Sequence, residues 1–174
     1  MRHKIRDIGE SGIDICVDVT EAWLASECAD AAVTLSKEGV RLEGRLEPAG
    51  DGYLLRGNLR GVLTASCARC LEPAPVVIDS PMAISFVESD EDDDEEEEDE
   101  AQDDVVKFEH GLIDVSNPIR DEILLAVPMS VICREDCAGI CPSCGRNRNL
   151  TPCDCEKHAI DTSKLGALAK IKLQ

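Results

Sequence analysis

The sequence predicts an α+β fold: an antiparallel β-meander or partly open barrel with short helices, ending in a C-terminal segment of cysteine knuckles. Three observations predict it. Apolar and polar residues alternate with period two over much of residues 13–87, which is typical of half-buried strands. Residues 118–127 carry apolar side chains at helical spacing. Six of the ten cysteines lie between Cys133 and Cys155.

At 174 residues, the chain suits a single domain with an appendage. Its composition divides it into three parts. Residues 1–87 are the β-rich N-terminal part of the domain. Residues 88–104 are acidic and predict a disordered loop, and residues 105–174 combine a helix with a cysteine-rich segment.

The N-terminal part begins with a strand over residues 13–19, after which Thr20 can cap a short helix. A meander is expected from residue 32 onward. Its predicted segments are a strand over 33–35, a turn at Glu38-Gly39, a strand over 40–47, a hairpin loop over 48–52, one or two strands over 53–66 with any break near Gly57 or Gly61, and strands over 76–78 and 82–87.

The acidic block accounts for most of the net charge of −18. Residues 88–104 contain fourteen acidic residues and no lysine or arginine. The remaining 22 acidic and 18 basic residues leave a balance of −4, so the folded part is close to neutral. Like charges repel and cannot enter a core, which favours a solvated spacer over an interaction motif.

After this block, a short strand is expected over residues 112–115. Ser116 or Asn117 can then cap a helix with Pro118 at its first position, and Pro128 ends it. The helix leads the chain towards Cys133.

Eight of the cysteines form four close pairs, which supply enough thiols for two tetrahedral four-cysteine zinc sites. A tight turn between paired cysteines can aim both sulfurs at one ion. Cys16 and Cys28 fall outside the pairs and are interpreted as small apolar residues. The predicted ligands are Cys67, Cys70, Cys133, Cys137, Cys141, Cys144, Cys153 and Cys155.

Two other interpretations of the cysteines are less favoured. Disulfides suit small secreted domains, but no export signal is visible. A redox-active Cys67/Cys70 pair would normally open a helix, and Pro73 and Pro75 prevent a long helix there. Unpaired thiols without a signal indicate a reducing cytoplasm, and no run of residues is long enough to cross a membrane.

Motifs for catalysis are absent from the sequence. It has no phosphate-binding glycine loop, no Gly-x-Ser-x-Gly elbow and no His-Glu-x-x-His. All-cysteine zinc sites are closed and structural, whereas catalytic zinc keeps an open position. We therefore expect no enzyme activity and no small-molecule substrate.

Three blocks of the sequence resemble the YceD-like family, the large ribosomal RNA subunit accumulation proteins. Residues 67–73 resemble its C-x-R-C-L-x-P signature, and residues 121–128 its D-E-I-x-L-x-x-P helix. Residues 133–145 resemble its C-x-x-x-C-x-G-L-C-P-x-C-G segment, with Ile140 in place of leucine. The likeness spans roughly residues 30–170, although residues 146–149 only approximate the usual G-x-N-L-N.

The resemblance implies a non-enzymatic role in maturation or accumulation of large-subunit ribosomal RNA. It implies as partner a pre-large-subunit ribosomal particle, contacted through ribosomal RNA or through a ribosomal or assembly protein. It further suggests that Cys67 and Cys70 share a site with Cys133 and Cys137, while the four later cysteines form another. Pairing of Cys67/Cys70 with the pair at 153 and 155 is the alternative.

Any RNA contact is expected from the mildly basic region that begins at Cys133, which has seven basic and five acidic residues. The candidate contacts are Arg134, Arg146, Arg148 and Lys157. Two other functions compete with the ribosomal one. They are a zinc-ribbon adaptor for another cytoplasmic machine, such as transcription, and a thiol redox enzyme.

Overall fold

The computed structural model describes residues 1–89 and 105–155. The predicted acidic loop, apart from its first two residues, and the candidate contact Lys157 lie outside the described residues. None of the helices in the described part is both long and apolar enough to cross a membrane.

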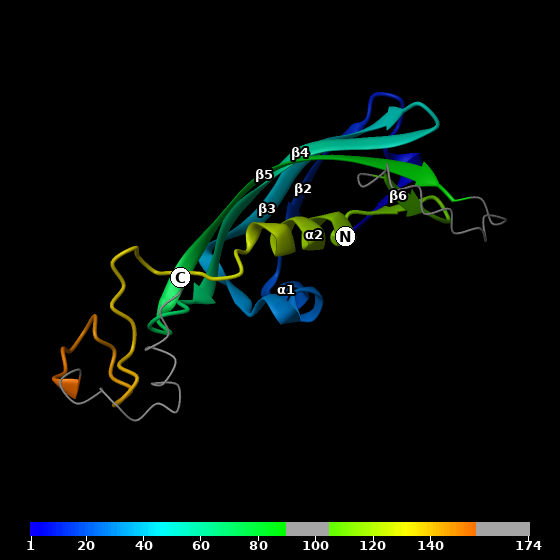
Figure 1. Ribbon diagram of the computed structural model, residues 1–174. Coiled ribbons are helices and arrows are strands. Elements are labelled where there is room, and N and C mark those ends of the chain that lie inside the picture. Colours follow the sequence, from blue (N-terminus) through cyan, green and yellow to red (C-terminus); the bar gives the residue numbers. More distant parts are fainter. Residues whose placement is uncertain (90–104, 156–174) are drawn as a thin grey trace, which may run out of the picture.

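A long, curved, open sheet dominates the fold (Figure 1). Its strands are ordered β2-β3-β4-β5-β6, with antiparallel pairing from β2 to β5 and parallel pairing between β5 and β6. The strand bounds are β2 Ile13–Asp18, β3 Val33–Ala49, β4 Gly52–Ser66, β5 Pro73–Glu88 and β6 Val105–Phe108. The predicted antiparallel meander is therefore confirmed as an open sheet.

Smaller elements surround this sheet. A second, two-stranded sheet pairs β1 with β7, and two α-helices and two 3-10 helices complete the described chain. Helix α2 lies along the concave side of the curved sheet, and α1 lies beyond it (Figure 1). The bounds are β1 Arg2–Lys4, η1 Ile5–Asp7, α1 Glu21–Glu27, η2 Ala29–Ala31, β7 Leu112–Asp114 and α2 Ser116–Ala126.

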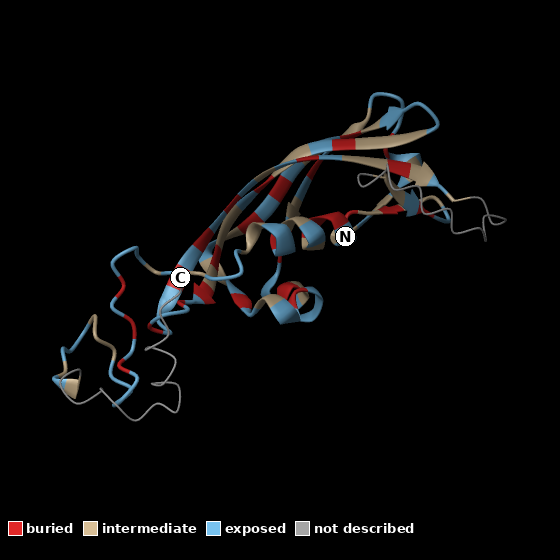
Figure 2. Ribbon diagram, in the orientation of Figure 1, coloured by how far each residue is buried: buried red, intermediate tan, exposed pale blue. Residues whose placement is uncertain are grey.

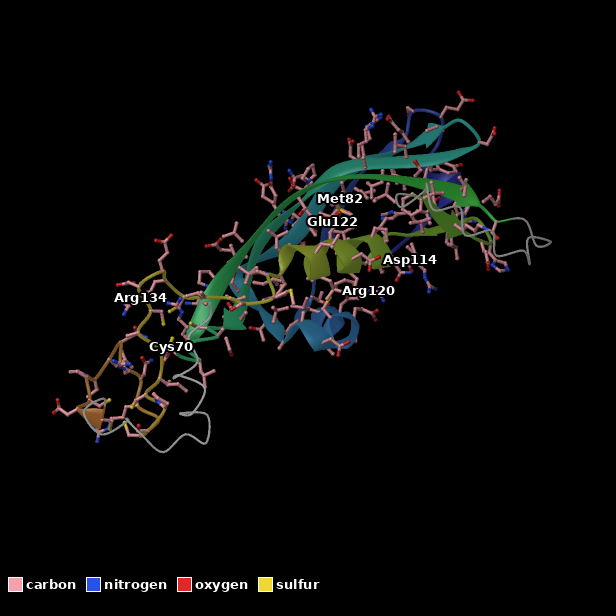
Figure 3. The ribbon with its side chains drawn as sticks, viewed as in Figure 1. Cys70, Met82, Asp114, Arg120, Glu122 and Arg134 are labelled. Carbon is pink, nitrogen blue, oxygen red and sulfur yellow. The ribbon has the colours of Figure 1, made fainter. Side chains whose placement is uncertain are left out.

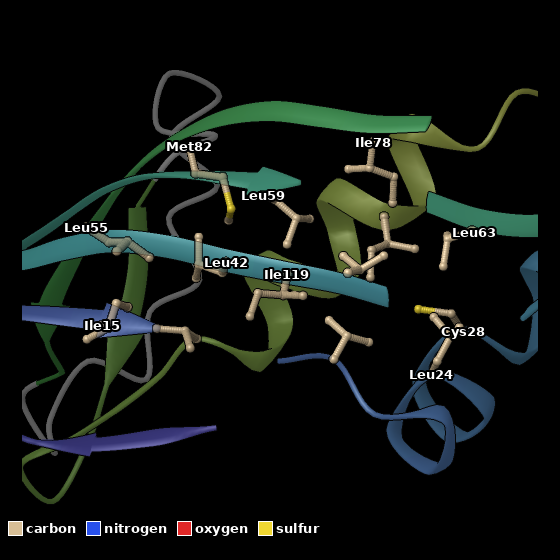
Figure 4. Packing of buried hydrophobic residues seen from close by; sticks show 14 of the residues in the cluster. Ile15, Leu24, Cys28, Leu42, Leu55, Leu59, Leu63, Ile78, Met82 and Ile119 are labelled. Atoms are coloured by element: carbon tan, nitrogen blue, oxygen red, sulfur yellow. The ribbon is translucent and has the colours of Figure 1, made fainter. Parts of the chain in front are cut away.

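The core lies between the concave face of the sheet and helix α2 (Figures 2 and 4). Alternate residues of β3, β4 and β5 point to this side, as period-two patterning requires, and they include the buried side chains of Leu42, Leu59 and Ile78. Helix α2 contributes Ile119 and Ile123, both fully buried. The core contains aliphatic side chains almost throughout, because the chain has few aromatic residues.

The central strands are longer and more continuous than the sequence suggests. Strand β3 runs through the expected turn at Glu38-Gly39, with a register irregularity between Leu35 and Val40. Strand β4 shows no break at Gly57, which stands opposite Gly44. A Cβ at position 57 would lie only 2.6 Å from the Glu43 carbonyl oxygen. Glycine here permits close approach of two strands instead of ending one.

Prolines do not divide β5. Pro73, Pro75 and Pro81 all lie within this strand, which pairs with β6 only from Ser85 to Glu88. Proline lacks the N–H that a central strand needs, so it is tolerated where one edge of the strand is unpaired. The interruption expected between residues 78 and 82 is therefore wrong.

Helix α2 begins differently from the prediction. It starts at Ser116, so Pro118 is its third residue and not its first. The carboxylate of Asp114 accepts a hydrogen bond from the Ser116 backbone N–H at 2.9 Å, so a residue from β7 satisfies a donor of the first turn. Figure 3 shows Asp114 at this end of the helix.

Candidate metal centres

Two distant segments bring together the first group of cysteines. Strands β4 and β5 are joined by a six-residue loop, because Ser66 pairs with Pro73, and this loop carries Cys67 and Cys70. After α2, the chain runs to the same end of the sheet and supplies Cys133 and Cys137 (Figure 1). The loop is anchored by hydrogen bonds from Cys67 N to Glu72 O (2.9 Å) and from Ala68 N to Val131 O (2.8 Å).

The sulfur atoms of this first centre are arranged to hold one ion. All four lie within 4.8 Å of one another. The Sγ atoms of Cys67 and Cys137 are 3.9 Å apart, and those of Cys70 and Cys133 are 3.6 Å apart. Four sulfurs at about 2.3 Å from a tetrahedral zinc ion would be separated by about 3.8 Å. The donor set therefore fits a metal of this kind.

Hydrogen bonds to sulfur support the charged form of two of these thiols. The Cys133 backbone N–H donates to Cys67 Sγ at 3.4 Å and, despite burial, lowers the pKa of Cys67 to about 6. Burial raises the pKa of Cys137, but hydrogen bonds from the Asn149 side chain and the Gly139 backbone outweigh it and lower that pKa. Such donors stabilise a thiolate without competing for the metal.

Arg69 joins the two segments of the first centre. Its guanidinium Nη1 donates to the carbonyl oxygens of Glu135 and Cys137, both at 3.2 Å. Its own carbonyl accepts from Ile140 N at 2.9 Å. The close approach of the two backbones requires glycine at position 139. Gly139 has a φ of +70°, and an added Cβ would lie 2.9 Å from the Arg69 carbonyl oxygen. The arginine inside the Cys67–Cys70 loop thus has a structural role.

The remaining four paired cysteines form a second centre. The sulfurs of Cys141, Cys144, Cys153 and Cys155 also lie within 4.8 Å of one another. A turn closes between Cys141 and Arg146, with hydrogen bonds from Cys141 N to Arg146 O and from Gly145 N to Cys141 O, both 2.8 Å. Cys144 is exposed, and Cys153 and Cys155 are half-buried, so this centre is the more open of the two.

The close spacing of the thiols in each centre favours the binding of a positive ion. In the second centre, backbone N–H groups of Cys144 and Ser143 lower the pKa of Cys141 to about 6, whereas the Cys144 thiol and burial raise the pKa of Cys155 to about 12. In the first centre, burial and the neighbouring thiols raise the pKa of Cys133 to about 12. In each centre, at least one thiol has a lowered pKa and ionises readily, whereas two others, Cys70 and Cys133 in the first and Cys153 and Cys155 in the second, have a raised pKa and resist further negative charge. A bound dication would remove that resistance.

All eight predicted ligands therefore fall into two groups of four that could hold metal ions. The grouping coincides with the one that the family resemblance implies, and the alternative union of Cys67/Cys70 with the pair at 153 and 155 does not occur in the structure. Cys28 is buried in the hydrophobic core, whereas Cys16 is exposed on β2. That these groups bind a metal stays a prediction.

The geometry at Cys67 and Cys70 does not suit thiol exchange. Both residues are buried, with Cys67 fully so. They lie in a loop between two strands, and each sulfur faces a further cysteine from another segment. A redox-active pair needs an accessible thiolate to attack its substrate.

Asn149 connects the two centres, and the sequence alone did not point to it. This residue lies between the cysteine pairs of the second centre, yet its side-chain Nδ2 donates to Cys137 Sγ of the first centre at 3.3 Å. Its Oδ1 accepts from Ala138 N and from Arg134 Nη2, each at 2.8 Å. The approximate match of residues 146–149 to the family motif was the available signal.

The candidate RNA-contact residues differ in their exposure and in the contacts that hold their side chains. Arg134, labelled in Figure 3, is held by Asn149 and by an ion pair with Asp136 at 3.3 Å. Arg148 is half-buried. Arg146 is exposed, and its side chain makes no hydrogen bond or ion pair recorded among the described residues.

Comparison with known proteins places these features in a family. The sequence model described as "Large ribosomal RNA subunit accumulation protein YceD" matches residues 55–172, which include both groups of cysteines. An uncharacterized protein of Mycobacterium tuberculosis is 35% identical over 104 residues, covering 60% of this chain and 49% of the relative. No solved structure matches the chain significantly.

Two further relatives extend the comparison. Large ribosomal RNA subunit accumulation protein YCED homolog 1, chloroplastic, of Zea mays is 32% identical over 149 residues, covering 71% of this chain and 48% of the relative. The uncharacterized protein YlbN of Bacillus subtilis is 27% identical over 138 residues, covering 78% of this chain and 75% of that protein. The chain spans about half the length of most curated relatives that it matches. With a family match over residues 55–172, this chain belongs to the YceD family of large ribosomal RNA subunit accumulation proteins.

Proposed function

We propose that this protein is a non-enzymatic, zinc-binding factor that supports processing and accumulation of large-subunit ribosomal RNA in the cytoplasm. The observation that carries the proposal is the family match, which extends over both groups of cysteines. The name of the maize relative gives a role in large ribosomal RNA subunit accumulation for that protein. The ribosomal role is more specific than that of a general adaptor, for which no comparison offers support.

Zinc is the proposed metal because of the ligand chemistry. Both groups consist of four thiols, and four-thiolate tetrahedral sites are typical of structural zinc. With all four positions taken by sulfur, the ion has no open site for water or substrate. A metal at the first centre would hold the segment after α2 against the β4–β5 loop, and a metal at the second would close residues 141–155. This supports a role in binding and not in turnover.

The proposed partner is a pre-large-subunit ribosomal particle. A net charge of −18 argues against broad, non-specific attraction to RNA, and each zinc bound by four thiolates would add a local charge of −2. Contact with RNA would then be confined to a few cations, among which Arg134 and Arg146 are the exposed described candidates.

Exposed apolar residues favour a protein contact beside any RNA contact. Leu125 near the end of α2 is 80% exposed, and Met129 just beyond it is fully exposed. Together with Leu124, Val127 and Pro128, Met129 lines a shallow cavity of about 290 Å³. Apolar surface of this kind, close to the metal segment, supports binding to a ribosomal or assembly protein.

The test is a deletion strain complemented by wild-type protein or by variants. We expect loss of the protein to lower mature large-subunit RNA relative to small-subunit RNA. The tagged protein should sediment with pre-large-subunit particles and not with RNA polymerase. Normal RNA ratios in the deletion strain would reject the proposed function while leaving the metal centres unaffected.

A cross-linking experiment identifies the direct partner. Photo-reactive residues placed at Arg146 and, separately, at Met129 would report on the two surfaces. We expect RNA cross-links from position 146 and protein cross-links from position 129. Charge reversal at Arg146, with metal content checked, should weaken particle association without affecting the fold.

A further inference from the structure

The Asn149 side chain is positioned by the second centre but acts on a ligand of the first. Residues 145–152 form the loop between the two cysteine pairs of the second centre, so a metal held by those pairs closes this loop. Within it, Asn149 Nδ2 donates to Cys137 Sγ at 3.3 Å. The two centres thereby share one hydrogen bond.

Neighbouring groups fix the orientation of this amide. Its Oδ1 accepts two hydrogen bonds of 2.8 Å, from the Ala138 backbone and from Arg134, so the nitrogen must face the sulfur. Asn147 Oδ1 accepts from both the backbone and the side chain of Asn149, at 3.0 and 2.9 Å. Asn147 also donates to Glu72 at 3.2 Å, in the loop that carries Cys70. The loop of the second centre is thus tied to both segments of the first.

We propose that Asn149 is a positioning residue that couples metal binding at the two centres. A metal at Cys141, Cys144, Cys153 and Cys155 would hold loop 145–152 in place, and the ordered Asn149 N–H would then stabilise Cys137 as a thiolate ligand of the first centre. This inference rests on the proposed function only in requiring that both centres bind metal.

The physical basis is charge and preorganisation. Four thiolates around one dication leave a net charge of −2, and a donor N–H directed at sulfur offsets part of it. An unclosed loop would have to lose conformational entropy before Asn149 could donate, so the bond contributes less when the second centre is empty. Linkage makes the effect reciprocal: metal at the first centre also raises affinity at the second.

This coupling gives the centres an order of metal loss. Cysteines of the first centre are mostly buried, whereas the second centre includes the exposed Cys144. A chelator should therefore reach the second metal first. Its removal then weakens binding of the first metal, which holds the segment after α2 to the sheet.

The experiment uses the full chain loaded with ¹¹³Cd²⁺ as a spectroscopic substitute for zinc. Nuclear magnetic resonance of the metal gives one signal per centre, assigned with Cys155→Ser, which disables the second. Competition with a chelator, followed signal by signal, gives the affinity of each centre. Asn149→Asp is the key variant, because it keeps the oxygen acceptor but removes the N–H donor. Thr151→Ala is the matched control, since its exposed side chain lies in the same loop and makes no hydrogen bond within the described part of the chain.

We expect Asn149→Asp to shift the signal of the first centre and to weaken metal binding there by about 10-fold or more, the range seen when groups that support a metal ligand are removed. Cys155→Ser should weaken the first centre similarly, and combining both changes should add little more. Thr151→Ala should leave both signals in place.

Unchanged first-centre affinity in Asn149→Asp or Cys155→Ser, or fully additive losses in the double variant, would overturn the coupling while leaving the two metal centres intact. A wild-type chain that takes up no metal would overturn the proposed function as well. If Cys155→Ser does not fold, the signal shift and affinity of Asn149→Asp with both centres filled still decide the question.

Discussion

The sulfur atoms of Cys67 and Cys137 lie 3.9 Å apart although the two residues are 70 positions apart in sequence. Cys67 comes from the loop that joins β4 to β5, and Cys137 comes from the segment that follows helix α2. The first centre therefore joins the β-sheet to the C-terminal part. The second draws its four cysteines from only 15 residues, so a metal there would stabilise mainly that local segment.

Substitution of one ligand in each centre should separate these roles. Cys67→Ser should remove the first metal and lower the free energy of unfolding of the whole domain by more than about 4 kcal/mol, because metal binding at such sites is folding energy. Cys153→Ser should remove the second metal and loosen mainly residues 138–155. Zinc analysis and urea unfolding of both variants provide the measurement. Collapse of the sheet in Cys153→Ser but not in Cys67→Ser would contradict the assignment.

Helix α2 offers a matched pair of core and surface positions. Ile119 is fully buried against the sheet, whereas Leu125 is 80% exposed on the same helix. Ile119→Ala should cost about 2–5 kcal/mol through lost burial and a cavity. Leu125→Ala should change stability by no more than about 0.5 kcal/mol. Equal effects from the two changes would show that α2 does not pack as described.

The carboxylate of Asp114 predicts a pH dependence. Burial by itself raises the pKa of Asp114, but hydrogen bonds from Ser116 and Arg2 outweigh it and lower that pKa below its usual range. A depressed pKa in the folded state stabilises the protein above the unfolded value of about 3.9, and this contribution is lost as the pH falls through the folded value. Asp114→Ala should therefore cost about 1 kcal/mol at pH 7, as loss of a helix cap does.

The difference between wild type and Asp114→Ala should be constant from about pH 5 to about pH 7 and shrink in more acidic solution. Asp121→Ala is the control, because this exposed carboxylate pairs with Arg120 at the surface of the same helix and such a pair contributes little. Urea unfolding across the pH range measures both. A difference that grows as the pH falls would exclude the proposed cause.

The acidic block is expected to be dispensable for folding. Glu88 pairs with Phe108 at the end of β5, so the replaced segment should begin at residue 90. Exchanging residues 90–104 for a short Gly/Ser linker should change the free energy of unfolding by less than about 1 kcal/mol, because like charges cannot enter a core and loop length has a weak effect. A large drop in melting temperature would show that the acidic residues pack or pair.

Much of the fold follows from local patterns in the sequence. Period-two alternation predicted the strands of the meander, and apolar residues at helical spacing predicted α2, from which Ile119 and Ile123 enter the core. The ends of the strands were harder to predict from the sequence, because glycine and proline usually interrupt strands. Gly57 instead permits close approach to β3, and Pro81 lies on the edge of β5 that β6 leaves unpaired.

Spacing predicted the eight paired cysteines that the structure gathers into two groups of four, but it did not predict the residues that support them. Paired thiols have few alternative uses in a chain of this kind. Asn149 and Arg69 are common residue types in loops, and nothing local distinguishes a donor to a distant sulfur from an ordinary turn residue. The role of Arg69 depends on a contact with a segment more than 60 residues away in sequence. The role of Asn149 depends on a contact between the two groups of cysteines.

Metal content with sulfur coordination tests the central claim most directly. Protein purified under reducing conditions should contain two zinc ions per chain, and X-ray absorption at the zinc edge should show four sulfur ligands at about 2.3 Å and no nitrogen or oxygen ligand. One equivalent of zinc or none in natively folded protein, or a light-atom ligand at either site, would contradict the account of two closed four-cysteine centres.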